Sequence, residues 1–172
     1  TAEGRIARYP FGLPMLAIHT IGAGGGSIGW LDEGGLLRVG PKSAGAEPGP
    51  ACYGRGGCAP TCTDADLLLG YLHAGYFLGG RLPLEPEAAR RAVLTLAAPM
   101  GRSVEDAAAG MFDVINANMA AGIRHVTVER GHDPRAFPLV VAGGAGPVHA
   151  AAIARELGIA RVLVPRDSSI FC

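Results

Sequence analysis

"VVAGGAGPVHA", residues 140–150, is the stretch that decides the fold class. The apolar run that leads into it, 136–142, has the composition of a strand buried on both faces. The residues that follow have the composition of a helix ended by Gly158, and Pro147 suits the first helical position, where its missing N–H costs nothing. "RVLVP" then predicts a second strand. We therefore predict an α/β protein in which 136–165 form a βαβ unit with a right-handed crossover and a parallel sheet.

The glycines of this turn suit a ligand site. Gly143, Gly144 and Gly146 would let a ligand approach the backbone, and the helix N-terminus adds a partial positive charge. Ligands of open α/β sheets bind at the carboxyl ends of the strands. His149 stands where the dinucleotide fingerprint, counted from Gly144, needs its third glycine, and no acidic residue ends the next strand. An NAD-dependent dehydrogenase is therefore disfavoured, and close helix–strand packing is the alternative explanation of the glycines.

A second glycine cluster lies in "HTIGAGGGSIGW", residues 19–30. It opens a predicted strand at 28–31, which "DEGG" joins to a second strand at 36–39 in a hairpin. Because no helix follows the cluster, anion binding would rely on backbone N–H groups alone. The alternative is a tight connection between two buried strands. The candidate phosphate or substrate contacts of this loop are Gly24, Gly25, Gly26 and Ser27.

Residues 22–62 are predicted to hold the loops of a site. Pro48, Pro50 and Pro60 exclude a helix from 40–62, and ordered loops of this length are usually functional. "GAGGGS" and "SAGAEPGPACYG" carry few large apolar side chains, yet regular elements flank both. We therefore expect 22–27 and 43–54 to face one cleft, opposite "GGAGP" at 143–147.

Helical periodicity marks the middle of the chain, above all the segment 85–131. Ser103 begins a capping box in which Asp106 replaces the usual Glu, and Gly131 is the expected end of a helix roughly 40 Å long. Asn116 falls between core positions of that helix, which predicts a buried polar contact. The expected helices are 64–72, about 85 to 99, and 103–131, and a short strand is expected at 16–18.

Three titratable side chains are candidate catalytic groups. Asp64 and Asp66 in "TDAD" could act as acid and base or hold a cation, although helix capping alone would explain Asp64. His19 precedes the glycine loop, where an imidazole could meet a substrate. The cysteines 52, 58 and 62 lack the C-x2-C spacing of a zinc ribbon, so we assign no metal site to them. A packed or solvated role is the commoner one for the remaining polar candidates, which are His125, Arg130, His132, Asp133 and His149.

Composition excludes several function classes. The chain has 172 residues, with 15 basic and 15 acidic side chains and only 6% aromatic residues, which argues against a nucleic-acid groove or an anionic membrane surface. No apolar run reaches the length of a membrane span. Four cysteines are too few for a disulfide scaffold, so a cytoplasmic location is predicted. The chain begins with Thr1 and stops just after a predicted strand, so we expect it to be a piece of a longer protein.

Several of these stretches together resemble one family, and they occur in the family's order over almost the whole chain. They are "TIGAGGGSIGW", "LRVGPKSAGAEPGPACYGRGG", "PTCTDADLLLGYL", "FLGGRLPL", "VERGHDPRAFPLVVAGGAGPVHA" and "ELGIARVLVPR". The sequence is similar to the hydantoinase A/5-oxoprolinase family, which includes acetone carboxylase-type subunits.

The resemblance implies part of an ATPase fold of the actin/Hsp70/sugar-kinase (ribonuclease H-like) type. Family members use ATP, with Mg²⁺, to activate a cyclic amide or a ketone, and an amide-ring carbonyl would be phosphorylated and then hydrolysed. By this resemblance Gly143, Gly144 and Gly146 become nucleotide-binding candidates, and residues 24–27 lie near the transferred phosphate or the substrate. A hydantoinase B-type subunit or domain is the implied partner.

The two Asp-x-Gly-Gly-Thr phosphate motifs of the family are missing from this sequence. The chain is therefore expected to be the later part of the catalytic core and to be inactive by itself. The last residues, "DSSIFC", are more similar to those of the carboxylase-like members. A beta-type subunit of a ketone carboxylase, and a non-catalytic segment that packs against a partner, are the alternative hypotheses.

Overall fold

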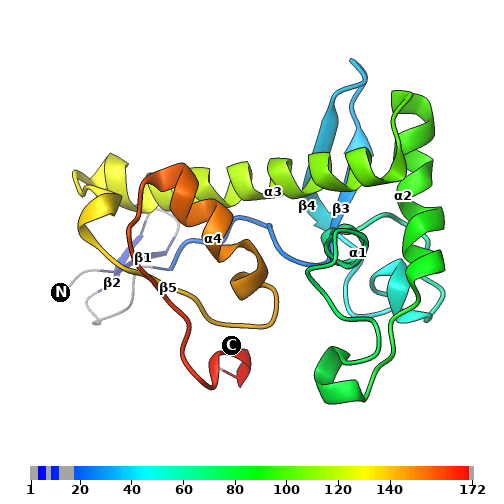
Figure 1. Ribbon diagram of the computed structural model, residues 1–172. Coiled ribbons are helices and arrows are strands. Elements are labelled where there is room, and N and C mark those ends of the chain that lie inside the picture. Colours follow the sequence, from blue (N-terminus) through cyan, green and yellow to red (C-terminus); the bar gives the residue numbers. More distant parts are fainter. Residues whose placement is uncertain (1–3, 7–8, 12–17, 171–172) are drawn as a thin grey trace.

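The computed structural model describes residues 4–6, 9–11 and 18–170, and within them it is a mixed α/β structure (Figure 1). Two short strands, β1 (Gly4–Ile6) and β2 (Tyr9–Phe11), pair antiparallel. Except for Ile18, the strand expected at 16–18 lies outside the described residues, and Ile18 itself is not in a strand. Within the described residues, no helix is both long enough and apolar enough to cross a bilayer.

The predicted hairpin is confirmed. β3 (Ser27–Leu31) and β4 (Leu37–Ser43) pair antiparallel, with Gly29 opposite Val39. Asp32 forms the turn because its Oδ1 accepts the backbone N–H groups of residues 34 and 36, at 3.0 and 2.9 Å. A Cβ at Gly29 would lie 2.8 Å from a methyl carbon of Leu96, so the backbone of the hairpin packs closely against the helices at this residue.

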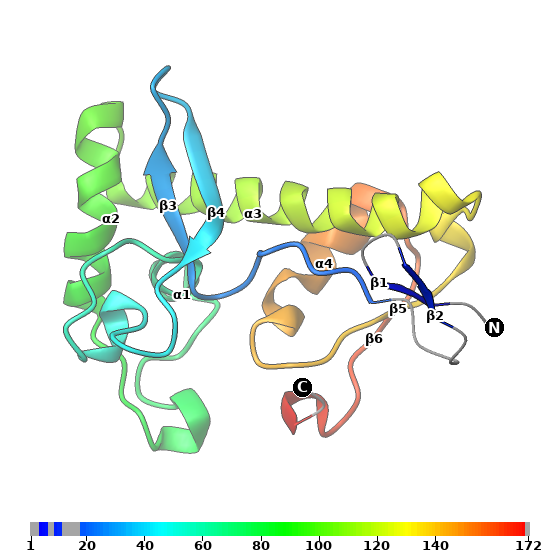
Figure 2. The same cartoon turned by 180° about the vertical axis from the view of Figure 1, so that it is seen from behind.

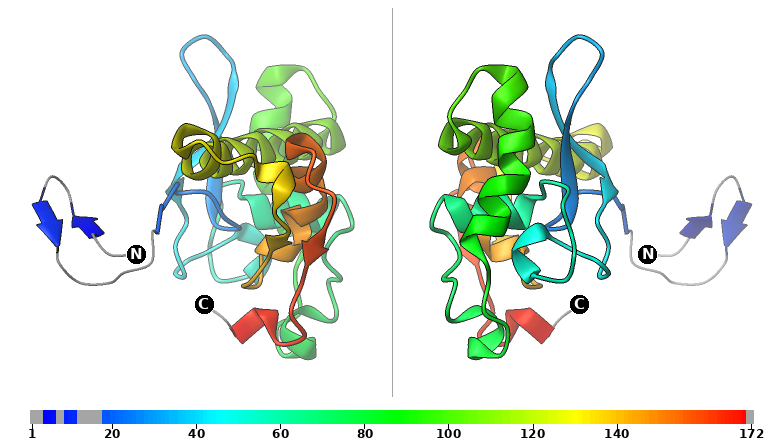
Figure 3. Two further views of the ribbon diagram at one scale, coloured as in Figure 1. Left: turned by 90° about the vertical axis from the view of Figure 1, so that its left-hand side faces the viewer. Right: turned by 90° about the vertical axis from the view of Figure 1, so that its right-hand side faces the viewer.

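Three helices pack with this hairpin around the main core. They are α1 (Cys62–Leu68), α2 (Pro86–Met100) and α3 (Val104–Thr127). At 1.5 Å per residue α3 is about 36 Å long, and it runs the length of the molecule (Figure 1). The hairpin projects beyond α3, and the C-terminal turn Ser168–Ile170 lies on the other side (Figure 3). The centre of the core consists of Val39, Cys62, Ala65, Val93, Leu96, Ala97, Val104, Ala107, Ala108, Met111 and Ile115.

The predicted helices are found, with corrections at their ends. Ser103 caps α3 by accepting the N–H of Asp106 at 3.0 Å, as expected. Thr61, not Asp64, is the N-cap of α1, and Asp64 is the third helical residue of a capping box. Gly131 does not end α3 itself but a following 3-10 turn, Val128–Arg130, with a left-handed φ of 79°.

The βαβ order at the C-terminal end is confirmed. β5 (Leu139–Val140) and β6 (Val162–Leu163) pair in parallel, and α4 (Gly146–Leu157) connects them. α4 packs on the second half of α3, and Figure 2 shows the segment that enters β3 passing along the same part of α3. The buried centre of the α3–α4 contact consists of Ala120, Ile153 and Leu157.

The expectation that residues 136–142 form a strand buried on both faces is wrong. The strand has two residues, and 52% of Phe137 and 60% of Val140 are exposed. The apolar run could be buried only if layers covered both faces of its sheet. In the part of the chain that the structure describes, the sheet has two strands and no such second layer.

The Asp64 carboxylate joins the start of α1 to the long loop. Asp64 is fully buried and accepts the backbone N–H groups of Ala51, Cys52 and Thr61 at 3.2, 2.7 and 2.9 Å. It also accepts the Thr61 hydroxyl at 2.7 Å. Charge-assisted bonds of this kind are about twice as strong as neutral ones. One side chain therefore fixes where the loop 43–54 meets the helix.

We predict that Asp64→Asn lowers the free energy of unfolding by about 2–4 kcal/mol, because the amide has one oxygen: if it replaces Oδ2, the new NH2 group faces the buried Cys52 N–H, and if it replaces Oδ1, the other three donors lose their acceptor. Chemical denaturation measures the loss. Asp113→Asn is the matched control, since Asp113 is exposed on α3, and it should stay within about 0.5 kcal/mol of the wild type. Equal stabilities of the two variants would contradict this role of Asp64.

Candidate functional site

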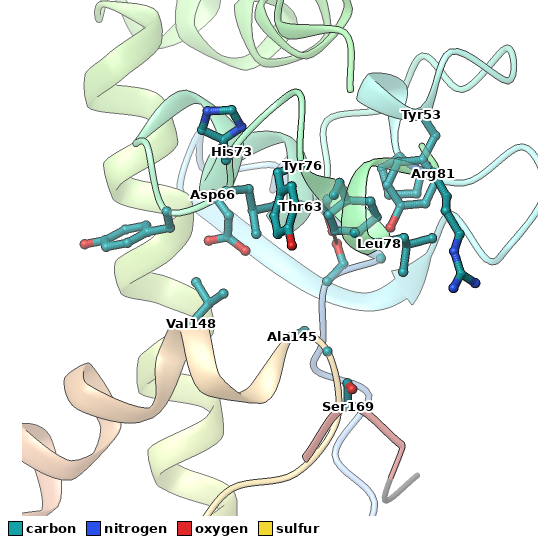
Figure 4. Close-up of a pocket in the computed structure, with 18 of the residues that line it drawn as sticks. Tyr53, Thr63, Asp66, His73, Tyr76, Leu78, Arg81, Ala145, Val148 and Ser169 are labelled. Carbon is teal, nitrogen blue, oxygen red and sulfur yellow. Dashed lines mark hydrogen bonds between the residues drawn. The ribbon is translucent and has the colours of Figure 1, made fainter. Parts of the chain in front are cut away.

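A cavity of about 1120 Å³ lies between the glycine-rich loops and the start of α4 (Figure 4). One wall comes from both predicted loops, 22–27 and 43–54, together with α1 and the segment 71–81. The facing wall comes from the turn before α4 and from Ser169. The prediction that the two loops face one cleft opposite "GGAGP" is thereby confirmed.

The glycine turn at 24–27 is held by its own carbonyl and hydroxyl groups. Gly24 N–H donates to the Ser27 hydroxyl at 3.0 Å, and Ser27 N–H donates back to the Gly24 carbonyl at 3.0 Å. The Gly25 carbonyl accepts both the N–H and the hydroxyl of Thr63, each at 2.9 Å. Gly25 and Gly26 line the cavity, and their N–H groups have no partner among the described residues. These two N–H groups are therefore unused within the described structure, whereas those of Gly24 and Ser27 are used within the turn.

The three glycines before α4 have different roles. Gly144 lines the cavity, and a Cβ added there would meet no atom within 4 Å. Gly143 has a left-handed φ of 88°, and its N–H donates to the Ser168 carbonyl at 2.7 Å. A Cβ at Gly146 would lie 2.9 Å from Val141, so close packing of α4 explains this glycine. Of the three nucleotide-binding candidates, only Gly144 is itself part of the cavity wall.

The N-terminus of α4 meets the cavity without a side-chain cap. Ala145 is the N-cap residue and lines the cavity, and Pro147 follows in the first turn. The first N–H groups of a helix have no partner within it and carry the positive end of the helix dipole. This end of α4 therefore favours an anionic group in the cavity.

Asp66 is the buried carboxylate of the cavity wall. It is 3% exposed, and burial raises the pKa of its carboxyl to about 7. Its Oδ2 lies 3.7 Å from Nε2 of His149, a fully buried residue of α4. His149 Nδ1 is 3.0 Å from Oδ1 of Asn116 on α3, which is the buried polar contact that we expected of Asn116. No pattern in the sequence indicates that His149 is its partner.

The other two catalytic candidates lie outside the cavity wall. Asp64 is fully buried and its oxygens are occupied by four donors, so it fixes structure and cannot reach a ligand in the cavity. His19 is exposed, and its ring lies 4.4 Å from the ring of His125 on α3. The hypothesis that His19 meets a substrate beside the glycine loop therefore has no support in this cavity.

The cysteines do not form a metal site in the described structure. Cys52 and Cys62 are buried in separate apolar clusters, and Cys58 is exposed. Burial, reinforced by the charge of Asp66, raises the pKa of the Cys62 thiol to about 12, which opposes the thiolate that a metal needs. Among the residues that the structure describes, no three His, Cys, Asp or Glu side chains group closely enough to hold a metal ion.

Part of the cavity wall is aromatic, which was not predicted from the sequence. The segment 71–81 contributes Tyr71, Tyr76, Phe77 and Arg81 to the cavity, and Tyr53 comes from the second loop (Figure 4). The sequence does contain a feature that could have indicated them: residues 71–81 are rich in aromatic side chains but show no helical periodicity. Except for Tyr53, these residues lie outside both loops in the sequence, and the tertiary fold brings them to the cavity.

Comparisons with known proteins agree on one family. A model of the family Hydantoinase/oxoprolinase matches residues 1–172. Caprolactamase subunit alpha from Pseudomonas jessenii is 52% identical over 96% of this chain and 24% of its own length. The 5-oxoprolinase 1 of Arabidopsis thaliana is 41% identical over 98% of this chain and 14% of its own length.

Two solved structures have the same fold. The crystal structure of ATP-dependent caprolactamase from Pseudomonas jessenii is 50% identical, with a TM-score of 0.87 over 98% of this chain and 25% of that one. A nucleotide-free acetone carboxylase structure is 34% identical, with a TM-score of 0.86 over 98% and 24%. The chain thus spans about a quarter or less of the length of these relatives.

We predict that Asp66→Asn makes the protein relatively more stable as the pH rises. The folded-state pKa of about 7 exceeds the unfolded value of 3.8, so the wild type loses stability between about pH 4 and pH 7 as the unfolded carboxyl ionises first. The amide has no such ionisation. The difference in thermal midpoint between variant and wild type should therefore increase over this window and then level off. A constant difference would show that Asp66 titrates normally.

Proposed function

The chain belongs to the hydantoinase/oxoprolinase family, and from this premise we propose that it is part of an ATP-dependent hydrolase that opens cyclic amides of the hydantoin or 5-oxoproline type. The cavity is its site for the nucleotide and the reacting carbonyl. The rest of the active site is expected in the remainder of a longer protein.

One observation carries this proposal: two anion-binding elements face each other across the cavity. The free N–H groups of Gly25 and Gly26 lie on one wall, and the uncapped start of α4 lies on the other. Backbone N–H groups and helix N-termini are the usual phosphate-binding elements of proteins. A volume of about 1120 Å³ is sufficient for a nucleotide together with a small ring.

The roles of individual residues follow from their places. Gly144 and the start of α4 contact the nucleotide, while Gly143 and Gly146 act indirectly by shaping the turn. The 24–27 turn lies near the transferred phosphate or the substrate, with Gly25 and Gly26 as donors. Of the three catalytic candidates, Asp66 lines the cavity and His19 and Asp64 do not, so Asp66 is the proposed catalytic group.

The residues that line the cavity suit the phosphates of ATP, but they do not by themselves form a complete Mg²⁺ site. Mg²⁺ is usually held by one or two carboxylates together with the substrate phosphates. Among the described residues, Asp66 is the only carboxylate in the cavity wall. When bound, Mg²⁺ would neutralise charge on the phosphates, and its protein ligands are expected from the Asp-x-Gly-Gly-Thr motifs, which leaves Asp66 free to act on a proton. An actin/Hsp70/sugar-kinase-like architecture of the whole protein, and a cytoplasmic location, remain predictions on the same footing.

A ketone carboxylase is the second candidate function. The similarity to an acetone carboxylase structure favours it. The chain would then be part of a beta-type subunit of that carboxylase. In either case a second subunit of the hydantoinase B type is the expected partner, since the related caprolactamase chain is itself called a subunit. ATP hydrolysis by the full-length protein with its partner separates the two functions. We expect stimulation by hydantoin, 5-oxoproline or caprolactam, whereas stimulation only by acetone with bicarbonate would favour the carboxylase.

We predict that Gly144→Val abolishes nucleotide binding by the full-length protein without unfolding it. The new side chain would project into the open cavity where the ligand approaches the backbone. Calorimetric titration with ATP measures the loss. Gly34→Val in the exposed hairpin turn is the control and should bind ATP as the wild type does. Unchanged affinity of a folded Gly144→Val variant would show that this glycine only serves the geometry of the turn, as in a non-catalytic packing segment.

We also predict that residues 1–172 alone do not hydrolyse ATP. The chain lacks both Asp-x-Gly-Gly-Thr motifs, which would hold Mg²⁺ and the terminal phosphates. Phosphate release by the purified chain should equal that of a boiled sample. Metal-dependent release above that level, lost in Gly144→Val, would contradict the prediction.

A further inference from the structure

The unpartnered buried polar atoms of the described side chains all lie in one place. They are Asp66 Oδ1, Asn116 Nδ2 and His149 Nε2, from α1, α3 and α4 respectively. The exposed fractions of the three residues are 3%, 6% and 0%. A buried polar atom without a partner destabilises the fold, so three together require an explanation.

The arrangement of His149 leaves one nitrogen free for Asp66. The amide oxygen of Asn116 can only accept, so His149 Nδ1 carries a hydrogen and donates it at 3.0 Å. In the neutral imidazole Nε2 then has a lone pair, and it faces Asp66 Oδ2 at 3.7 Å. The Phe112 ring stacks on the imidazole with centroids 5.2 Å apart, and Tyr71 stacks on Phe112. The imidazole is therefore fixed in one tautomer and one orientation.

A purely structural role explains Asp64 but not Asp66. Both carboxylates are buried on α1, two residues apart. Four donors meet the oxygens of Asp64, whereas Asp66 Oδ1 has no donor, and Asp66 lines the cavity. Because Oδ1 is buried, contact with a ligand falls to Oδ2, the oxygen that faces His149 Nε2.

We infer that Asp66 and His149 form a joint proton acceptor, which holds one proton between Asp66 Oδ2 and His149 Nε2 and takes it from the water that hydrolyses the activated ring. Asn116 is a positioning residue in this unit, because it acts through His149. The inference rests on the proposed hydrolysis of a cyclic amide.

The water oxygen forms a bond to the phosphorylated carbonyl carbon, and the π pair of the C=N bond moves onto the ring nitrogen. One water proton passes to Asp66 Oδ2, is shared with His149 Nε2 and is then delivered to that nitrogen. The proton of the new hydroxyl follows by the same route: the hydroxyl oxygen forms the C=O bond, the C–N bond breaks with its electron pair on nitrogen, and the proton is delivered there. The ring thus opens to an amine, which holds both water protons, and an acyl phosphate. The pair ends in its starting state, as a general base that becomes a general acid must.

The surroundings favour a proton acceptor that works near neutral pH. Burial raises the pKa of Asp66 to about 7 and lowers the pKa of His149. A catalytic base is most effective when its pKa is close to the working pH. The other titratable or charged groups that face this region or line the cavity are Cys52, Tyr53, Cys62, Asp64, Tyr71, His73, Tyr76 and Arg81.

The first test is the pH profile of ATP-dependent ring opening by the full-length protein with its partner. Asp66→Asn should lower kcat at least about 100-fold and abolish the acid limb near neutrality, with KM for ATP unchanged within about twofold. His149→Leu should move the acid limb to lower pH, because two sites bind one shared proton more tightly than one site does. Asp113→Asn should match the wild type. An unchanged acid limb in Asp66→Asn would overturn the inference.

A second test needs no activity. Thermal midpoints of the wild type, Asp66→Asn, His149→Leu and the double variant form a double-mutant cycle at each pH from 4 to 9. A shared proton makes the coupling between the two substitutions change with pH, whereas independent sites give the same coupling at every pH, which would overturn the pair. Absence of ring opening together with a pH-dependent coupling would refute the proposed function and still support the shared proton.

Discussion

The burial of the Asp64 carboxylate is the constraint on which the site depends. A carboxylate out of water is tolerable only when donors replace its hydration, and four donors from residues 51, 52 and 61 do so here. The long loop and α1 are therefore fixed to each other. α1 then carries Thr63, which holds the glycine turn, and Asp66, which faces the cavity. The positions of both follow from that one buried charge.

The local elements could be predicted from the sequence because their signals are local. The hairpin follows from the Asp32 turn, the start of α3 from Ser103, and the end of α4 from Gly158 with its left-handed φ. The shared cleft was also predictable, since two loops poor in apolar side chains must be placed by the elements that flank them. The family was evident from motifs that run along the whole chain.

The parts of the site that could not be predicted depend on contacts between residues that are distant in the sequence. Nothing near His149 in the sequence indicates Asn116, which lies 33 residues away on another helix. The different roles of Asp64 and Asp66 could not be predicted from the sequence. The path of residues 51 and 52 decides which of the two carboxylates accepts their N–H groups. The exposed strand β5 was mistaken for a buried one because composition reveals the apolar character of a segment but not the layers that cover it.

The cavity wall formed by 71–81 differs in kind from the wall formed by α1. Tyr71, Tyr76 and Leu78 are more than half exposed, and none belongs to the main core or to the Asp64 network. Substitutions of the exposed side chains Tyr76 and Leu78 alter the shape and polarity of the cavity, whereas Leu72 and Phe77 of the same segment pack against a buried cluster. Such a division lets the shape of a cavity change by mutation at little cost in stability. It offers a physical reason why one scaffold can be adapted by evolution, or by directed evolution in the laboratory, to ligands of different size.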